Sequence, residues 1–340
     1  MTIKPLALTL GDPAGIGPEI TVKAWRALRN GGAPFMLVGD FENLSAASPD
    51  GAAILERVTG PAEAGAVFPR AIPVLDIPLA APVVAGKADP AHAGAIIRWI
   101  ETAAGLALSG EVSGVVTAPI AKAPLYAAGF PFPGHTEFLA DLTAAAKHDG
   151  ARGPVMMLAA GDLRTSLVTI HKPLAGVAPA LTIQAIVNVG LVTAQALARD
   201  FGITRPRIAM AALNPHAGEN GALGREEIEI LRPAARSLRD LGVACGDPAP
   251  SDTLFHPEAR ARYDAVVCMY HDQALIPVKM LDFWGGVNIT LGLPIVRTSP
   301  DHGVGYDIAG RGLARPDSLI AAVRAAADIA ERRQALSHAA

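Results

Sequence analysis

Short apolar runs alternate with alanine-rich stretches along almost the whole chain, and this alternation limits the possible folds more than any other feature. Runs such as 6–10 and 35–38 have the length of buried strands, and segments such as 17–29 and 90–108 have the length of helices. Strands and helices that alternate in this way form parallel sheets joined by crossover helices. The sequence therefore predicts an α/β protein.

The pattern gives a definite set of elements. Strands are expected at 6–10, 35–38, 72–75, 113–117, 155–159, 163–170, 207–213, 264–269 and 287–290. Helices are expected at 17–29, 90–108, 137–147, 180–200, 225–241 and 317–333. The second helix has a clear start, because Asp89 supplies an N-cap and Pro90 suits the first helical position.

The chain is too long for one ordinary hydrophobic core. Its 340 residues, 51 % of them hydrophobic, favour two α/β domains or one large barrel. The segment 129–134, rich in glycine and proline, is the strongest break in the pattern. We therefore predict a domain crossing near this segment.

Charge and cysteine content narrow the class of partner. The formal net charge is −3, and no basic run of the kind that binds nucleic acid or anionic membranes is present. Small molecules are therefore the expected partners. Cys245 and Cys268 are the only cysteines, and the apolar run at 6–10 is too short for a signal peptide core. Both features favour a reducing cytoplasm.

The uncharged stretch 173–198 could be mistaken for a membrane span. Pro173 and Pro179 break its first part, and Gln184, Asn188 and Gln195 share one helical face. We therefore expect a buried helix at 180–200 that contacts another subunit.

Three histidines lie at the ends of predicted strands. His171 follows 163–170, His216 follows 207–213, and His271 follows 264–269. Open α/β sheets bind ligands at the carboxyl ends of their strands, and three imidazoles with an open position are typical of catalytic zinc and related divalent metals. The alternative for each is a hydrogen-bonded, partly buried histidine.

The segment 269–307 reads as loop-rich and contains further polar candidates. Lys279, Asn288 and Arg297 provide two cations and an amide, a combination suited to anions. Arg297 follows an apolar run at 291–296, which argues against an ordinary surface charge.

Other candidates lie at turns and helix starts. His135 and Thr136 open a predicted helix, where donors suit a phosphate or carboxylate, although Thr136 could be an N-cap. Asp252 and Asp272 are candidates for orienting a ligand or transferring a proton, with an N-cap as the other role for Asp252. The turn at 11–19 could meet an anion, but its glycines at 11, 15 and 17 do not form the Gly-x-Gly-x-x-Gly fingerprint.

Several of these segments together resemble one family. The motifs LGDPAGIGPE, TAPIAK, FPFPGHTEF, IHKPL, LNPHAGENG, PSDTLF, MYHDQ and GVNITLGLPIVRTSPDHG are similar to those of the 4-hydroxythreonine-4-phosphate dehydrogenase family of pyridoxal phosphate biosynthesis. The segment DHGVGYDIAGRGLARP also resembles the loop that holds NAD in isopropylmalate and isocitrate dehydrogenases. The resemblance implies two α/β/α domains of the isocitrate/isopropylmalate dehydrogenase type, with the cofactor held by loops, and this accounts for the missing Rossmann fingerprint. The implied domains are 1–130 plus 300–340, with the glycine-rich turn and the NAD loop, and 131–299, with the metal and substrate residues and the dimer contacts.

The resemblance also implies roles for individual residues and a shared site in a homodimer. The metal ligands it implies are His171, His216 and His271, with zinc, magnesium or cobalt as the metal. The implied substrate contacts are His135, Thr136, Lys279, Asn288 and Arg297. The acidic and basic candidates for proton transfer are Asp252, Asp272 and Lys279. The implied contacts of NAD or NADP are Asp301, His302, Gly303 and Asp307.

The activity implied is oxidation of 4-phosphohydroxy-L-threonine at C3, followed by metal-assisted loss of CO2 to give 3-amino-2-oxopropyl phosphate. Three alternatives stay open from the sequence. The first is a dehydrogenase for 4-phospho-D-threonate or 4-phospho-D-erythronate in sugar-acid breakdown, which would use the same metal and phosphate groups. A metal-dependent hydrolase and a phosphosugar-binding protein without activity are more distant.

Overall fold

The computed structural model describes residues 4–339 and divides into two compact units. Unit 1 comprises 4–147 and 294–334, and unit 2 comprises 148–293 and 335–339. The predicted domain boundaries are 130/131 and 299/300, whereas the chain passes from one unit to the other at 147/148, 293/294 and 334/335. The first difference arises at helix α6 (His135–Leu142), which packs against helix α4 (Ala93–Leu108) and so stays with unit 1.

The sheet of unit 1 is parallel throughout, with the strand order β3-β4-β2-β1-β5-β12. Its central strands are fully buried, as expected for a parallel sheet with helices on both faces. The strands are β1 (Leu6–Thr9), β2 (Phe35–Gly39), β3 (Leu55–Arg57), β4 (Ile72–Asp76), β5 (Val115–Thr117) and β12 (Arg297–Pro300).

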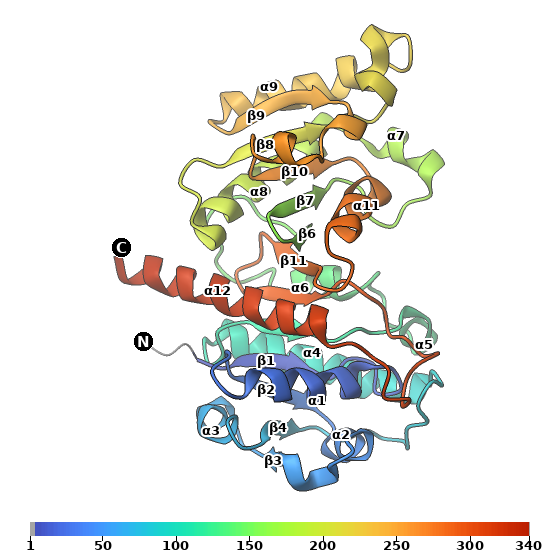
Figure 1. Ribbon diagram of the computed structural model, residues 1–340, viewed down its shortest axis with the longest axis vertical. Helices are drawn as coiled ribbons and strands as arrows, with labels where there is room; N and C mark the ends of the chain where they lie inside the picture. Colours follow the sequence, from blue (N-terminus) through green and yellow to red (C-terminus); the bar gives the residue numbers. More distant parts are fainter. Residues whose placement is uncertain (1–3, 340) are drawn as a thin grey trace. The chain divides into compact units, whose positions relative to one another are not determined.

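Helices cover both faces of this sheet. The chain moves from β1 to β2 in one direction and from β4 to β5 in the other, so right-handed crossovers place α1 and α4 on opposite faces. Figure 1 shows α1 in front of the strands and α4 behind them. The remaining helices complete the layers. The helices of unit 1 are α1 (Gly17–Leu28), α2 (Phe41–Ala47), α3 (Pro61–Val67), α4, α5 (Lys122–Ala127), α6 and α12 (Asp317–Ala339), with short 3-10 turns at Gly51–Ile54 and Pro90–His92.

The sheet of unit 2 has the strand order β11-β6-β7-β10-β8-β9. Strand β6 is antiparallel to both of its neighbours, and the other pairs are parallel. The strands are β6 (Val155–Ala160), β7 (Leu163–Leu167), β8 (Arg207–Ala211), β9 (Ala244–Ala249), β10 (Ala265–Cys268) and β11 (Val287–Leu291).

The crossovers of unit 2 diverge at β10. The connections β7–α8–β8 and β8–α9–β9 run toward one edge of the sheet, whereas β10–α11–β11 runs toward the other. Right-handed crossovers therefore put α8 and α9 on one face and α11 on the opposite face. Such a reversal opens a crevice at the carboxyl ends of the strands, here beside β10. The helices are α7 (Val177–Ala180), α8 (Ile183–Phe201), α9 (Arg232–Asp240), α10 (Pro257–Arg260) and α11 (His271–Leu281), with a π-helix at Glu227–Leu231 and 3-10 turns at Leu174–Gly176, Pro215–Gly221 and Ser251–Thr253.

The predicted α/β class is confirmed, and every predicted strand and helix has a counterpart in the structure. The interpretation of 269–307 as loop-rich is wrong, because this segment contains α11, β11 and β12. Helix α11 was not predicted because it contains Pro277, and β12 was not predicted because its four residues are polar or proline although all are buried. The remaining missed helices and strands are β3, β9, α2, α3, α5, α7 and α10, which are short or polar.

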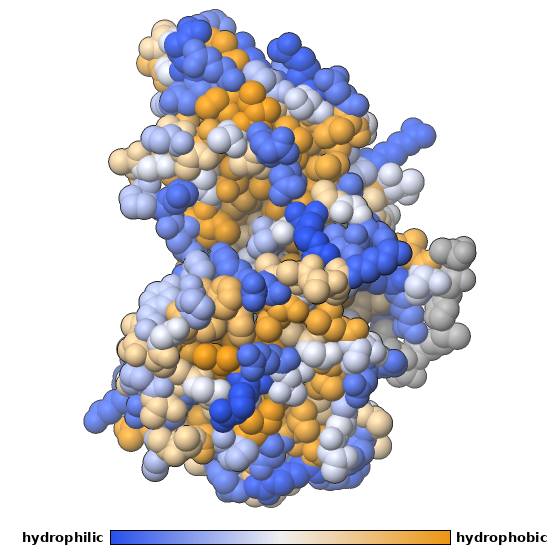
Figure 2. All heavy atoms as spheres, turned by 180° about the vertical axis from the view of Figure 1, so that it is seen from behind, coloured by the Kyte–Doolittle hydropathy of each residue, from blue (hydrophilic) through white to orange (hydrophobic). Residues whose placement is uncertain are grey.

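The uncharged stretch forms α8, which begins at Ile183 after a Thr182 N-cap and has a largely buried face. In the part of the chain that is described, no single helix is long and apolar enough to cross a membrane, and the pair Leu174–Ala180 and Ile183–Phe201 meets the length and composition test only with a 92° bend. Figure 2 shows hydrophilic and hydrophobic side chains mixed over the surface of each unit. Cys245 and Cys268 are buried free thiols.

Candidate active site

The three strand-end histidines follow three adjacent strands of unit 2. The order β7-β10-β8 places the segments leading to His171, His271 and His216 next to one another. The β7–β10 ladder continues past the strands, because the Val168 and Thr169 amides donate to the carbonyls of Cys268 and Met269. The rings of His171 and His271 consequently lie 5.9 Å apart, measured between centroids.

His271 opens α11 directly after β10. Its Nδ1 lies 2.7 Å from Oδ1 of Asp272, so the carboxylate orients the ring and leaves Nε2 as the nitrogen for a metal. Within residues 4–339, no group of three or more His, Cys, Asp or Glu side chains is close enough to hold a metal ion. The structure therefore brings two of the three predicted ligands together, and His216 is exposed in the adjacent turn.

A buried glutamine that the sequence analysis missed ties these strand ends together. Gln273 Oε1 accepts from the Met269 amide at 2.6 Å, and its Nε2 donates to the Ala212 carbonyl at 2.6 Å and to Ser251 Oγ at 2.8 Å. One side chain thus links the ends of β10 and β8 to the turn that carries Asp252. The MYHDQ motif contained this residue, but its burial could not be read from the sequence.

The other candidates of unit 2 lie in different settings. Asp252 is exposed inside the 3-10 turn whose N-cap is Pro250, so the alternative N-cap role for Asp252 is wrong. Lys279 lies near the end of α11, with Nζ 5.0 Å from the ring centroid of Phe283. Asn288 lies on β11, and its Oδ1 is buried without a hydrogen-bond partner among the described residues.

Arg297 opens β12 in unit 1 and is only 3 % exposed, as the apolar run before it predicted. Its Nη2 donates to Oγ1 of Thr117, at the end of the neighbouring strand β5, over 2.8 Å. Burial lowers the pKa of Arg297 to about 10, an effect that the negative charge of Glu137 partly offsets. The guanidinium therefore keeps its charge at neutral pH in a desolvated place, where an anion gains most from it.

His135 and Thr136 form the first turn of α6, after the N-cap Gly134. Thr136 is buried and is not the cap, so the alternative N-cap role is wrong. Burial, and then the positive charge of Arg297, lower the pKa of His135 well below its usual value. The imidazole is therefore neutral, and its buried Nε2 has no hydrogen-bond partner among the residues described.

The cofactor segment predicted at 301–307 packs against the N-terminal glycine-rich turn. The hydroxyl of Tyr306 donates to Oδ2 of buried Asp12 over 2.6 Å. Burial, together with the hydrogen bond to Asp12 and its negative charge, raises the pKa of Tyr306. Gly15 fits under the Val304 carbonyl, since an added Cβ would lie 2.7 Å from that oxygen. The glycine-rich turn at 11–19 therefore supports the segment 301–307 by direct contact.

The four predicted cofactor contacts lie within the loop itself. Asp301 contacts Ser318, whose Oγ lies 3.2 Å from the Asp301 amide. His302 Nδ1 lies 3.0 Å from the Gly303 carbonyl, and His302 Nε2 is buried without a hydrogen-bond partner in the described part of the chain. Asp307 is exposed, and its carbonyl accepts from Arg311.

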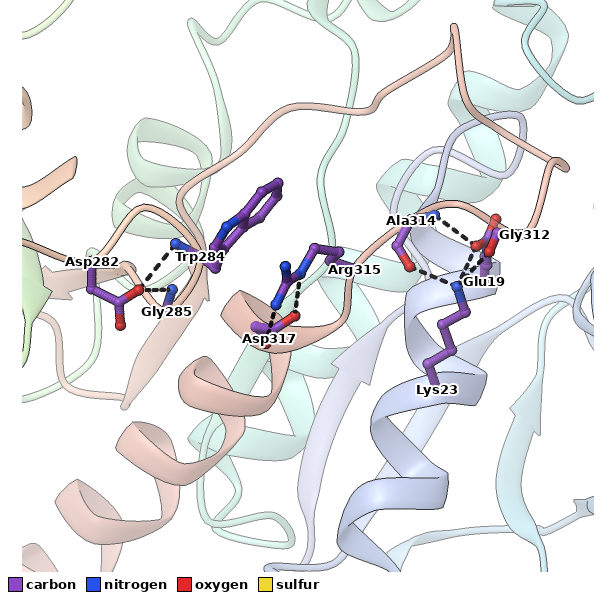
Figure 3. Close-up of polar contacts among 9 residues, drawn as sticks. All are labelled: Glu19, Lys23, Asp282, Trp284, Gly285, Gly312, Ala314, Arg315 and Asp317. Atoms are coloured by element: carbon purple, nitrogen blue, oxygen red, sulfur yellow. Dashed lines mark hydrogen bonds and ion pairs between the residues drawn. The ribbon is translucent and has the colours of Figure 1, made fainter. Parts of the chain in front are cut away.

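A salt bridge holds the far end of the same segment (Figure 3). Lys23 Nζ donates to Glu19 Oε1 at 2.7 Å and to the carbonyls of Gly312 and Ala314 at 2.9 and 2.7 Å. Glu19 Oε1 also accepts from the Ala314 amide at 2.8 Å. Beside this contact, a cleft of about 530 Å³ is lined by Glu19, Lys23 and Gly312 among others. Neither Glu19 nor Lys23 was predicted from the sequence as a site residue.

Unit 2 has strand-end imidazoles beside the crevice where its crossovers diverge, and unit 1 has a buried guanidinium. Each of these features is typical of ligand-binding α/β enzymes. Residues 33–326 match the family described as pyridoxal phosphate biosynthetic protein PdxA. The chain belongs to the PdxA family, as its motifs predicted. It is therefore an oxidoreductase.

Relatives of this chain support the same family along its whole length. It is 71 % identical over 333 residues to a 4-hydroxythreonine-4-phosphate dehydrogenase of Caulobacter vibrioides, with 98 % of this chain and 99 % of that protein covered. It is 55 % identical to one from Maricaulis maris, with 97 % and 99 % covered. The crystal structure of 4-hydroxythreonine-4-phosphate dehydrogenase from Klebsiella pneumoniae matches with a TM-score of 0.84 and 42 % identity, covering 96 % of this chain and 99 % of that one.

Proposed function

We propose that this chain oxidises 4-phosphohydroxy-L-threonine at C3 with NAD or NADP and releases CO2 to give 3-amino-2-oxopropyl phosphate, a step of pyridoxal 5'-phosphate biosynthesis. The observation that carries the proposal is the relative named 4-hydroxythreonine-4-phosphate dehydrogenase, which is 71 % identical over 98 % of this chain. The two free cysteines are consistent with a cytoplasmic location for the enzyme.

Unit 1 would bind anionic and polar parts of the substrate through Arg297, His135 and Thr136. Arg297 supplies a desolvated positive charge, and Thr117 fixes its guanidinium. The neutral His135 can donate or accept one hydrogen bond through its unpartnered Nε2. In unit 2, the buried Oδ1 of Asn288 can accept a hydrogen bond from a hydroxyl or an ammonium group.

His171, His271 and His216 would hold a divalent cation, such as zinc, magnesium or cobalt. The adjacent rings of His171 and His271 and the bond between His271 Nδ1 and Asp272 fit such a site. When bound, the cation supplies Lewis acidity toward the oxygens of the substrate. Asp252, Asp272 and Lys279 are the candidates that accept the proton of the C3 hydroxyl.

The segment with Asp301, His302, Gly303 and Asp307 would hold the nicotinamide cofactor. Support comes from two anchors of the loop, the bond of Tyr306 to Asp12 and the bonds of Ala314 to Glu19 and Lys23. A loop that is fixed before binding loses less conformational entropy when the nucleotide arrives. This arrangement needs no Rossmann fingerprint.

We further propose a homodimer with the active site shared between the subunits. Exposed apolar side chains on and after α11 support it, since Ile276, Met280, Phe283 and Trp284 are 49–81 % exposed. Asp282 Oδ1 accepts from the Trp284 and Gly285 amides and so fixes this surface (Figure 3). Because α11 also carries His271, a second copy on this surface would reach the metal site.

Sedimentation tests the dimer. Met280→Glu places a charge on the side chain that is 81 % exposed, and we expect it to shift the protein to monomer and to weaken metal binding. Leu241→Glu, at an exposed apolar position after α9, is the matched control and should leave the dimer intact. A Met280→Glu protein that sediments as wild type would argue against this surface.

The activity is tested by NADH formation from 4-phosphohydroxy-L-threonine, with 4-phospho-D-threonate and 4-phospho-D-erythronate in parallel. Metal-replete and chelator-treated enzyme are compared. Metal-dependent turnover of the first substrate alone supports the proposal. Preference for either other substrate would move the enzyme to sugar-acid catabolism, and no NADH from any of them would contradict dehydrogenase activity on this substrate class.

A further inference from the structure

The turn that carries His216 has an unusual backbone. His216, Ala217, Gly218, Glu219 and Asn220 all have positive φ, between 43° and 79°. Four of these five residues are not glycine, and L-residues rarely adopt this left-handed region. A run of this kind persists only where its surroundings hold it in place.

A buried carboxylate holds the start of this turn. Glu227 is 1 % exposed, and its Oε1 accepts from the amides of Leu213 and Asn214 at 2.8 and 2.7 Å. Its Oε2 accepts from the side-chain amide of Asn214 at 3.0 Å. Hydrogen bonds to an ionised acceptor are the strong ones, and these fix the two residues before Pro215 and His216.

The same carboxylate also lies against the middle of the turn. A Cβ added to Gly218 would be 2.7 Å from Glu227 Oε2, so the backbone there packs directly on the carboxylate. Glu227 opens the π-helix Glu227–Leu231, a rare element that is frequent at functional sites. Glu227 therefore contacts both the entry and the interior of the left-handed turn.

We propose that Glu227 is a positioning residue for the metal site: it fixes the left-handed turn from which His216 projects at the carboxyl end of β8. This inference rests on the proposed function of His216 as a metal ligand. Without the carboxylate, 213–220 can relax to ordinary right-handed conformations, and the imidazole leaves its place. Metal affinity should then fall although Glu227 never contacts the metal.

The test uses cobalt(II) as the probe metal in the full-length protein. Glu227→Ala should weaken cobalt binding about 10- to 100-fold and alter the visible ligand-field spectrum of the bound ion. Glu227→Gln should recover part of both, because the Gln Oε1 can still accept from the Leu213 and Asn214 amides. The matched control is Glu229→Ala, in the same π-helix, where the side chain is exposed and pairs with Arg225. It should bind cobalt as wild type does.

Hydrogen exchange of the metal-free proteins separates this inference from the proposed function. Glu227→Ala should accelerate exchange within 213–224 and not across the rest of unit 2. Unchanged exchange in this segment, or acceleration spread over the whole unit, would overturn the positioning role. If Glu227→Ala does not fold, the same comparison is made with Glu227→Gln.

The cobalt measurements test a separate point, which is whether the turn affects the metal site. Local acceleration of exchange with cobalt affinity and spectrum unchanged would overturn the link between the turn and the metal site. If wild type binds no cobalt, or if His216→Ala binds it unchanged, the metal role of His216 fails. The exchange data would then still decide whether Glu227 holds the turn.

Discussion

Replacing Lys23 by methionine should release the segment 312–315 from helix α1. The ammonium group donates three hydrogen bonds, to Glu19 Oε1 and to the carbonyls of Gly312 and Ala314. Methionine keeps an unbranched side chain of similar length, so packing against the helix changes little. The substitution therefore removes the polar contacts and leaves the apolar ones.

The size of the effect follows from the exposure of the contact. A hydrogen bond to a charged group contributes about 1.5–3 kcal/mol net when it is buried. The Lys23 side chain is 32 % exposed, and water replaces part of what is lost. We therefore expect the three hydrogen bonds together to stabilise the attachment of 312–315 to α1 by about 1–2 kcal/mol. At 1.36 kcal/mol per tenfold change, this corresponds to an increase of about 5- to 30-fold in KM for the nucleotide.

Two measurements on the Lys23→Met protein test this reasoning. KM for NAD should rise with kcat nearly unchanged, and hydrogen exchange should accelerate at 310–316. Arg26→Met is the control, because Arg26 lies on the same helix and pairs with Asp50 at the surface. Unchanged exchange in Lys23→Met would refute the role of the ammonium as a clamp. Faster exchange with unchanged KM would show that the segment does not hold the nucleotide.

Two further changes address the buried polar groups of unit 1. Thr117→Val removes the Oγ1 that accepts from Arg297 Nη2. In urea denaturation, this change should lower the free energy of unfolding by about 1–3 kcal/mol. An unchanged free energy of unfolding would show that this bond does not stabilise the fold. His135 has a lowered pKa in the folded protein, so the unfolded chain binds its proton first and stability falls as the pH drops below about 6.5. His135→Asn should flatten this acid limb in a series of denaturation curves, and an unchanged limb would assign it to other groups.

The strand-end histidines were predictable because an apolar run that ends in a polar residue marks a strand end without knowledge of the fold. His171, His216 and His271 were found in this way. Their grouping on three adjacent strands depends on the order β7-β10-β8, which long-range pairings create and no local pattern records. The sequence alone therefore predicted the three candidate histidines but not that their strands are adjacent in the sheet.

Other features were hidden because their local sequence contradicts their structure. Pro277 argues against a helix, yet α11 continues through it. Ala217 and Glu219 have positive φ although neither residue type favours it, so the local sequence did not predict a continuous left-handed turn. Such a conformation is imposed by tertiary contacts, here by Glu227, and only the structure reveals it.

In the proposed metal site of unit 2, exposed residues are the candidate ligands and buried residues hold the backbone that carries them. His171 and His216 are exposed, where they can meet a ligand, and their positions depend on residues that are buried. Gln273 joins the end of β10 to that of β8, and Glu227 fixes the turn that follows β8. Both buried residues act on the backbone, so replacing them should shift the ligands without removing any. Under the proposed function, the geometry of the metal site therefore depends on two buried side chains that hold the backbone at the strand ends.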